Sequence, residues 1–549
     1  MTSSPDESNV VSGTNRRSFI GRSAVAGIAI PALLPTLGMG TRALAQEATP
    51  AGQPLDEGSG GVLVIDLNFD PETLDPHQGL TAAAAFCMEQ MYEGFVRFKP
   101  GTVELEPWLA ESWETSEDGL SWIFHLRQGV LFHDGTPFNA EAVKFNYNRQ
   151  FDTTNEFNAL GQWTAVASFD FLESVSVVDE YTVEFKLSRV YNKFLLRLGG
   201  LSWVSPAAVQ ASREGFGENP IGTGPFAFQQ WDKGQQVVLK RNENWWGGSA
   251  RLDQVVFRAI IEPGARTAAL LSGEVNLTVQ ISPEIAQQIE TETALRVESA
   301  GTGSVWFLAM NIEFPKFSDV RVRQAINCAI DKDVIVSAVL GDTVDIAYGP
   351  LAPSYIDYNP KVTEYYAYDP ERAKQLLAEA EFVDDTPIVF RVPIGDPSML
   401  AAEEMATVIQ DNLREVGITT EIETSDAVSW MDAIRAPQNE LTEMSWNLAP
   451  VSPDDVSSGV LSRASLPPGF NTSYWVNEEF EELLLVGSTS LDEAEVHAAY
   501  MRCQEIVMEE APIVPVCHRR SLYGVSNIVH NFYAQPGGGL FLIEVWVEA

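Results

Sequence analysis

The chain has 549 residues, of which 45% are hydrophobic and 13 are tryptophan. This length exceeds that of a single hydrophobic core, so we expect two or three folded lobes, and the composition excludes general disorder. Basic residues number 35 and acidic residues 76, giving a formal net charge of -41. That charge excludes nucleic acid and an anionic membrane surface as partners.

The N-terminal segment has the features of an export signal. Arg16 and Arg17 form a pair that resembles the twin-arginine signal, and a proline-interrupted apolar run follows. Small residues predict cleavage after Ala45. We therefore expect a signal peptide over residues 1–45 and a flexible leader over residues 46–61. Whether the signal is cleaved or kept as an anchor stays open.

The first half of the remaining chain alternates strands with helices. We expect a strand at 62–67 and a helix at 80–95 that packs its apolar side chains inward. Residues 122–127 alternate as a strand. Asp134-Gly135 then forms a tight turn, and Asn139 caps the next helix.

A strand–helix–strand pattern marks the second half of the chain. The predicted elements lie at 388–392, 398–416 and 418–422, and a unit of this length forms a right-handed parallel crossover. Asp319 and Asp369 are predicted to cap two further helices. The fold class is therefore α/β.

Two apolar strands have the character of crossings between lobes. The strand at 305–311 leads into a second lobe, and the strand at 512–517 leads back out. We then expect residues 532–547 to return to the first lobe. Two crossings of this kind predict a hinge with a ligand cleft between the lobes.

The usual catalytic and nucleotide-binding motifs are missing from the sequence. It has no GxxxxGKS/T, GxSxG, HExxH or GxGxxG pattern. His125 and His133 are eight residues apart around one strand and turn, which is more typical of packing than of metal ligation. We predict no cofactor, no metal and no enzymatic activity. The alternative is an exported hydrolase acting on a small solute, because paired carboxylates cannot be told from solvated faces.

The cysteines lie in unrelated apolar contexts without CxxC spacing. Cys87 and Cys328 fall in helix-like runs, where a small buried thiol is expected. An oxidising compartment permits a bridge between Cys503 and Cys517, and the sequence does not decide whether they pair.

A series of short sequence words runs through nearly the whole chain after the signal. The words are Pro107 to Glu114, Trp122 to Phe138, Thr73-Leu74-Asp75-Pro76-His77, Tyr92-Glu93-Gly94, Gly222 to Phe226, Gly273-Glu274-Val275, Asp319 to Asn327 and Tyr368 to Lys374. Each is weakly specific, but their number and order closely resemble the extracytoplasmic solute-binding proteins of the peptide, nickel and opine class. Those proteins deliver ligands to ATP-driven importers.

The resemblance implies a two-lobed, periplasmic-binding-protein-like α/β fold of the large class, with a hinged cleft and an extra subdomain. It places lobe I at 62–304, with the inserted subdomain at about 98–201. Lobe II then covers 305–516, and residues 517–549 return to lobe I.

The same resemblance assigns residues to the pocket. In the class, the loop after the Leu-Asp-Pro-His word, the turn before the exit crossing and the exit strand line the ligand. The corresponding residues here are Gly79, Leu80, Thr81, Trp430, Trp446, Asn447, Leu448, Ala449, Cys517 and His518. Tryptophan suits such a role because it offers a large stacking face and one donor, although core packing is the alternative for Trp430 and Trp446.

One departure from the class concerns ligand identity. Peptide-binding members carry an Asp shortly after the pocket Trp, where it pairs with the peptide ammonium, whereas alignment on Trp446 places Ala449 there. A buried ammonium without a counter-charge costs several kcal/mol, which argues against ordinary oligopeptide binding. Asp454 or Glu443 would substitute if the loop were shifted. Peptides, opines, sugars and metal chelates all stay open.

We therefore expect a monomeric protein, outside the cytoplasmic membrane, that captures a small solute and passes it to an ABC permease. The permease and its ATPase must be separate chains, because this sequence has neither a spanning bundle nor a nucleotide loop.

Overall fold

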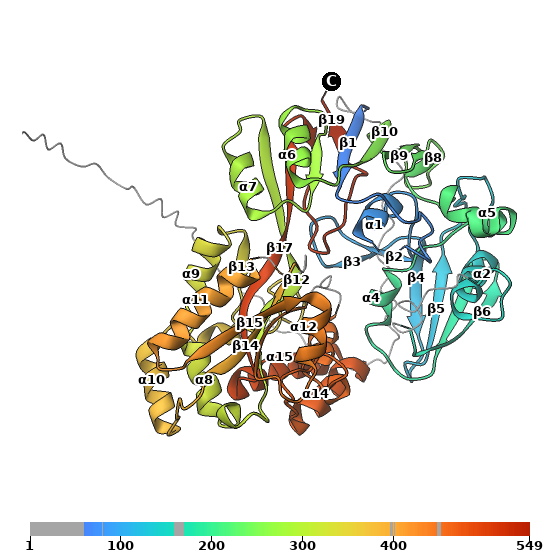
Figure 1. The fold of residues 1–549 in the computed structure, drawn as a ribbon. Helices are drawn as coiled ribbons and strands as arrows, with labels where there is room; N and C mark the ends of the chain where they lie inside the picture. Colours follow the sequence, from blue (N-terminus) through green and yellow to red (C-terminus); the bar gives the residue numbers. More distant parts are fainter. Residues whose placement is uncertain are drawn as a thin grey trace, which may run out of the picture. The chain divides into compact units, whose positions relative to one another are not determined.

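The computed structural model describes residues 60–79, 81–158, 169–395, 399, 401–446 and 452–548. The predicted signal peptide and most of the leader lie outside them. The fold is a two-lobed α/β fold, and an eleven-stranded mixed sheet extends through the described part (Figure 1). Its strands in order are β15 (Thr420–Asp426), β14 (Ile388–Ile394), β16 (Leu441–Trp446), β12 (Leu295–Met310), β17 (Ile513–Ser526), β11 (Leu277–Val279), β1 (Val62–Leu67), β10 (Gln254–Ala259), β9 (Gln236–Arg241) and β8 (Phe226–Asp232), with β13 (Val344–Ile346) paired to β17.

Smaller sheets and the helices complete the fold. The order in the four-stranded sheet is β4 (Ala110–Thr115), β5 (Ser121–Leu126), β7 (Thr182–Leu187) and β6 (Leu172–Asp179), and the two-stranded sheets are β2 (Val96–Phe98) with β3 (Leu105–Pro107) and β18 (Val529–His530) with β19 (Trp546–Val547). The α-helices are α1 (Ala82–Met88), α2 (Ala140–Phe151), α4 (Phe194–Leu198), α5 (Pro206–Ser212), α6 (Pro263–Leu271), α7 (Pro283–Glu290), α8 (Val320–Ala329), α9 (Lys332–Val334), α10 (Pro370–Glu379), α11 (Ala402–Glu415), α12 (Ala427–Ile434), α13 (Pro453–Val460), α14 (Glu478–Thr489) and α15 (Glu493–Glu510).

The two predicted crossings are the paired strands β12 and β17. They run antiparallel along most of their length and are both longer than the sequence indicated (Figure 1). Their register shifts between Gly301 and Val305, where β12 bulges. A bulge bends its strand and raises the local twist, so this point is a natural hinge.

The second half of β12 is apolar throughout because both of its faces are buried. Trp306, Leu308 and Met310 pack into one hydrophobic cluster, while the alternate residues Val305 and Phe307 pack into another. Side chains alternate across a strand, so a strand between two cores reads as a continuous hydrophobic run.

Local signals in the sequence account for several element ends. The predicted caps Asn139, Asp319 and Asp369 each accept a backbone N–H bond at the start of their helices, at 3.0, 2.8 and 2.8 Å. β14 and β15 are parallel and joined through α11, which confirms the predicted crossover unit.

Two helices are shorter than predicted. The helix expected at 80–95 ends at Met88, because the following turns direct Tyr92 and Phe95 into two different hydrophobic clusters. The helix expected from 398 begins at Ala402, after Ala401 adopts a left-handed conformation with φ 49°. Tertiary packing and local backbone geometry outweigh propensity at both sites.

The cysteine bridge that the sequence permitted is not formed. Cys503 and Cys517 are both free and buried, as are Cys87 and Cys328. Cys503 packs in the cluster on one face of the second lobe's sheet, and Cys517 packs in the cluster on the other face. The sheet therefore separates the two thiols.

Hydrophobic clusters show where the chain packs. Phe532, Leu542 and Val545 near the C-terminus share a cluster with Leu63 and Ile65 of β1. The strands β5 and β7 form a separate, phenylalanine-rich cluster with α4. Among the described helices, none is both long enough and apolar enough to cross a membrane.

Candidate functional site

Sheet topology brings three strand positions together beside the hinge. The parallel strands β14, β15 and β16 end at one edge of the sheet, the position at which open α/β sheets bind ligands. At that edge Trp446 is paired with Val305, and Val305 is paired with His518. Neighbouring strands lie about 4.8 Å apart, so Trp446 and His518 are separated by roughly 10 Å. We call this row the hinge edge.

The bulge at the hinge edge is held by side chains. Tyr355 donates its hydroxyl to the carbonyl of Gly303 at 3.2 Å, and Thr302 donates to the carbonyl of Arg519 at 3.0 Å. The His518 ring lies 3.2 Å from the carbonyl of Ser304 through Nδ1. Burial lowers the pKa of His518 to about 4, so the ring is neutral at physiological pH and donates this bond.

Trp446 is fixed from behind by α13. Its indole N–H donates to the carbonyl of Asp455 at 2.8 Å, and its ring meets Phe470 edge-on at 5.0 Å. Gly459 packs so closely that a Cβ there would lie 2.6 Å from the ring. Since the donor is already used, Trp446 can offer a ligand only the exposed part of its ring.

The other predicted pocket residues have mixed placements. Trp430 and Cys517 are enclosed in hydrophobic clusters, with 4% and 0% exposure. Thr81 is exposed and caps α1, and Gly79 is partly exposed beside it. Residues 80 and 447–449 lie outside the described residues. The assignment of these ten residues to a ligand pocket stays a prediction.

The loop that carries Gly79 and Thr81 is anchored by a buried ion pair. Arg149 of α2 pairs with the Asp75 carboxylate, donating to Oδ1 at 3.0 Å, and lies 2.6 Å from Nδ1 of His77. An arginine only donates, so Nδ1 accepts and Nε2 of His77 donates to the carbonyl of Ser202 at 3.0 Å. The Leu-Asp-Pro-His word therefore fixes the loop that precedes α1.

The exposed face of α1 begins at Thr81. Thr81, Ala85 and Glu89 are four residues apart, and all three retain solvent access while residues 86–88 are buried. Glu89 lies about 12 Å along the helix from Thr81. Sequence reasoning missed Glu89, because one acidic residue on a predicted helix cannot be told from a solvated face.

The two acids considered as replacements for the missing Asp differ in their contacts. Asp454 accepts the hydroxyl of Tyr500. Glu443 is 1% exposed, and neither carboxylate oxygen finds a hydrogen-bond partner within the described residues. Burial raises the pKa of Glu443 well above its usual range, which favours its neutral form.

Polar contacts join the segment before and within α4 to the second lobe. Arg197 pairs with Asp455, and Lys193 lies 3.3 Å from Asp357. The Asn192 amide donates to the carbonyls of Gly487 and Ser490, both at 2.8 Å. These contacts join α4 and the residues before it to the second lobe, and Asp455 connects them to Trp446 of the hinge edge.

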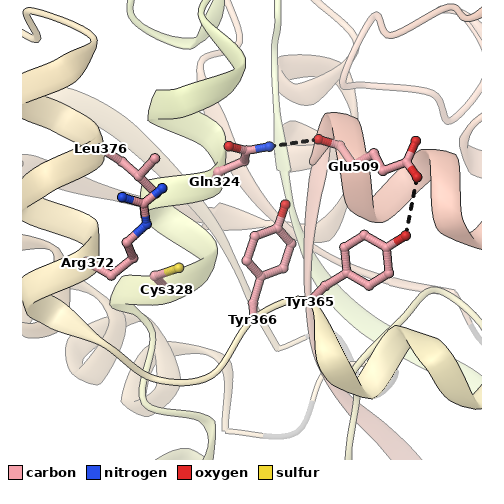
Figure 2. Close-up of a pocket in the computed structure, with 7 residues that line it drawn as sticks. All are labelled: Gln324, Cys328, Tyr365, Tyr366, Arg372, Leu376 and Glu509. Atoms are coloured by element: carbon pink, nitrogen blue, oxygen red, sulfur yellow. Dashed lines mark hydrogen bonds between the residues drawn. The ribbon is translucent and has the colours of Figure 1, made fainter.

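A separate depression of about 340 Å³ lies between α8, α10 and α15 (Figure 2). Its polar side chains have partners within the protein, and Arg372 and Tyr366 find theirs outside the lining, in Glu379 and the carbonyl of Met508. Gln324 donates to the carbonyl of Glu509 at 2.9 Å, and Tyr365 donates to its carboxylate at 3.3 Å. The depression includes none of the predicted pocket residues. Over the described residues, no group of His, Cys, Asp and Glu is arranged to hold a metal.

Comparison with known proteins identifies the family. Residues 104–465 match the family model described as bacterial extracellular solute-binding proteins, family 5 middle. Heme-binding protein A of Haemophilus influenzae is 33% identical over 500 residues, covering 86% of this chain and 89% of that protein. The dipeptide-binding protein of Escherichia coli is 30% identical over 508 residues, covering 88% of this chain and 94% of that protein.

Solved structures agree with this match. HbpA2 from Haemophilus parasuis superposes with a TM-score of 0.83 at 28% identity, over 89% of this chain and 100% of that one. DppA from Helicobacter pylori in complex with the peptide STSA gives a TM-score of 0.70 at 28% identity, over 90% and 99%. With the family model matching more than half of its length, the chain belongs to family 5 of the bacterial extracellular solute-binding proteins.

Proposed function

We propose that this protein encloses one small, peptide-like solute between its lobes, against the hinge edge. As a member of its family it captures a small solute and delivers it to an ABC importer. The observation that carries the proposal is the row Trp446, Val305 and His518, which sits beside the bulged crossing of β12 and β17. A ligand bound there touches the element whose bending closes the cleft.

The relatives support a peptide-like ligand. The E. coli relative is named as a dipeptide-binding protein, and the H. pylori structure holds a four-residue peptide. The H. influenzae relative is named for heme, so heme is the second ligand to test. None of these relatives is named as a hydrolase, so the hydrolase alternative gains no support.

The lobe limits at 304 and 516 and the subdomain at about 98–201 belong to the same proposal. We also infer that the protein acts as a monomer outside the cytoplasmic membrane, with the permease and ATPase as separate chains. Arg16 and Arg17 would direct its export. Fractionation of cells that express the protein with both arginines changed to Lys tests this export role, since Lys lacks the planar donor fork of Arg. Normal export of that variant would refute the role.

Scattering tests the closure directly. Small-angle X-ray scattering of the purified protein, with and without a mixture of di- and tripeptides, should show a smaller radius of gyration with peptides. The far-ultraviolet circular dichroism should not change, because the lobes move as units. An unchanged radius of gyration, with peptide retained, would contradict closure. Mass spectrometry of the retained peptide identifies the solute, and a parallel sample with heme decides between the two ligand classes.

A further inference from the structure

Glu89 is a carboxylate that the protein leaves without a cationic partner. It is the last residue of the exposed face of α1, and within the described residues it makes no ion pair. From the described residues, its carboxylate accepts one hydrogen bond, donated by the backbone N–H of Leu540 at 2.9 Å from Oε2. One neutral donor satisfies only part of a carboxylate, which has about four acceptor sites.

The chain beside Glu89 is shaped to approach it closely. At Gly539 a Cβ would lie 2.9 Å from Oε2 and 3.0 Å from Oε1, so the loop backbone lies directly against the Glu89 carboxylate and a larger residue there would displace it. The same loop reaches β17, where a Cβ at Gly538 would lie 3.1 Å from the Ser521 hydroxyl. Ser521 is three residues, or roughly 10 Å, along β17 from His518 at the hinge edge. Glu89 is thus linked through one short loop to the strand that forms the hinge.

The Glu89 side chain is exposed, and its carboxyl oxygens lie against the backbone of residues 539 and 540. Burial raises its pKa to about 7, and the Leu540 N–H offsets this only in part. The titratable groups that feel its charge are Cys87 of α1 and Tyr523 of β17, and both stay neutral because burial raises the pKa of each. The loop at 538–540 brings no charged side chain.

The cations near the cleft differ from Glu89 because they have partners. Arg197 is paired with Asp455, and Arg520 is held by Asp345 at 2.9 Å. A carboxylate held in a confined position without a counter-charge is most favourable when a ligand supplies the cation.

We infer that Glu89 is a specificity-determining residue that binds an ammonium or guanidinium group of the solute on the α1 side of the cleft. This inference rests on the proposed function and adds the charge of the ligand. It also gives the solute a counter-charge in a chain that has Ala449 where peptide-binding members have Asp.

The test uses one peptide mixture in two forms. Equimolar di- and tripeptides are either left untreated or acetylated on every amino group, which removes those cations while keeping the backbone. Wild type, Glu89→Gln and the control Glu284→Gln are incubated with each form at pH 8, and bound peptide is measured by native mass spectrometry and by the shift in melting temperature. Glu284 is exposed on α7, so its variant removes the same charge elsewhere.

Wild type and Glu284→Gln should retain untreated peptides at least tenfold better than acetylated ones, and Glu89→Gln should lose that preference. Titration of wild type at pH 7 in buffers of different ionisation enthalpy should show proton release on binding, because a bound cation lowers the carboxyl pKa. A structural role for Glu89 predicts no proton release.

Two other results would overturn the inference, and they differ in what they say of the proposed function. If wild type retains both forms equally, or Glu89→Gln keeps the preference, the inference fails while solute capture stands. If wild type retains no peptide of either form, capture of a peptide-like solute fails and the inference fails with it. Circular dichroism of Glu89→Gln confirms that the variant is folded before binding is compared.

Discussion

The two walls of the proposed cleft, the hinge edge and the exposed face of α1, satisfy their polar groups in different ways. At the hinge edge, the donors of Trp446 and His518 are bonded within the protein, and Asp455 is paired with Arg197. On α1, Glu89 has one backbone N–H. The polar groups of the hinge edge have their partners without a ligand, whereas Glu89 gains a counter-charge only when a ligand supplies it.

Because of this difference, we expect one wall to select the solute by its shape and the other to select it by its charge. A wall whose polar groups are already bonded can select a solute by fit and by contact with an aromatic face. A wall with a carboxylate that lacks a counter-charge selects by charge, because a solute without a cation leaves that carboxylate unpaired. Substitutions on the two sides should therefore change different measured quantities.

The largest effect is expected from Trp446→Ala. The ring is packed against Phe470 and Gly459, so its loss should lower the free energy of unfolding by about 3 kcal/mol, the lower end for deleting a buried aromatic side chain. Peptide affinity should fall as well, by more than tenfold. Chemical denaturation and calorimetry measure the two quantities. Lower affinity with unchanged stability would show that the ring is not held by packing at the hinge edge.

Trp446→Phe separates packing from hydrogen bonding at the same position. Phenylalanine keeps most of the ring contact but leaves the Asp455 carbonyl without its donor. It should therefore recover most of the lost stability, since a single hydrogen bond contributes about 1 kcal/mol.

Asp455→Asn should have the next largest effect, on closure rather than on folding. It removes the counter-charge of Arg197, whose remaining side-chain contact is the Tyr191 hydroxyl at 3.3 Å. A partly buried cation left without its acid costs about 2 kcal/mol, which corresponds to roughly thirtyfold weaker peptide binding if only the closed form is affected.

Calorimetry measures that affinity, and Asp170→Asn serves as the control. Asp170 and Arg189 are 2.8 Å apart, with 62% and 52% of their side chains exposed. Loss of such an exposed pair should change affinity by less than 1 kcal/mol. Equal affinity of wild type and Asp455→Asn would show that the α4 contact does not stabilise the closed form.

The elements that form the hinge edge could largely be predicted from the sequence, because they follow from local sequence patterns. The crossover of β14, α11 and β15 follows from hydrophobic periodicity, and the apolar run around Phe307 marks a strand buried on both faces. The helix caps are single residues with known preferences. Such features depend on neighbours within a few positions.

The charge-selective wall could not be predicted, because its defining contacts join distant parts of the chain. Leu540 is 451 residues from Glu89. No periodicity or motif links such positions. The resemblance to a family placed Thr81 near the ligand, but it could not show that the same helix face ends in an unpaired carboxylate.

The smallest effect is expected from Glu89→Gln on the stability of the ligand-free protein. This substitution should raise stability although it weakens binding of amino-bearing peptides. The pKa of Glu89 is about 7 in the folded protein, against 4.5 for an unperturbed glutamate. At or below pH 4.5 the folded protein benefits fully from binding this proton more tightly than the unfolded chain does. As the pH rises through 7 the benefit is lost, and a carboxylate must be held charged in an unfavourable place.

Glu89→Gln removes that burden, so the variant should melt at a higher temperature than wild type at pH 8 and at nearly the same temperature at pH 4.5. The shift should be small because the carboxyl keeps some solvent contact. Scanning calorimetry without peptide measures it, and Glu284→Gln controls for lowering the overall negative charge. A variant that gains stability at pH 8 while losing its preference for amino-bearing peptides has exchanged function for stability, as binding residues commonly do. If Glu89→Gln melts lower than wild type at pH 8, the carboxylate stabilises the empty fold, and the contrast between the two walls is wrong.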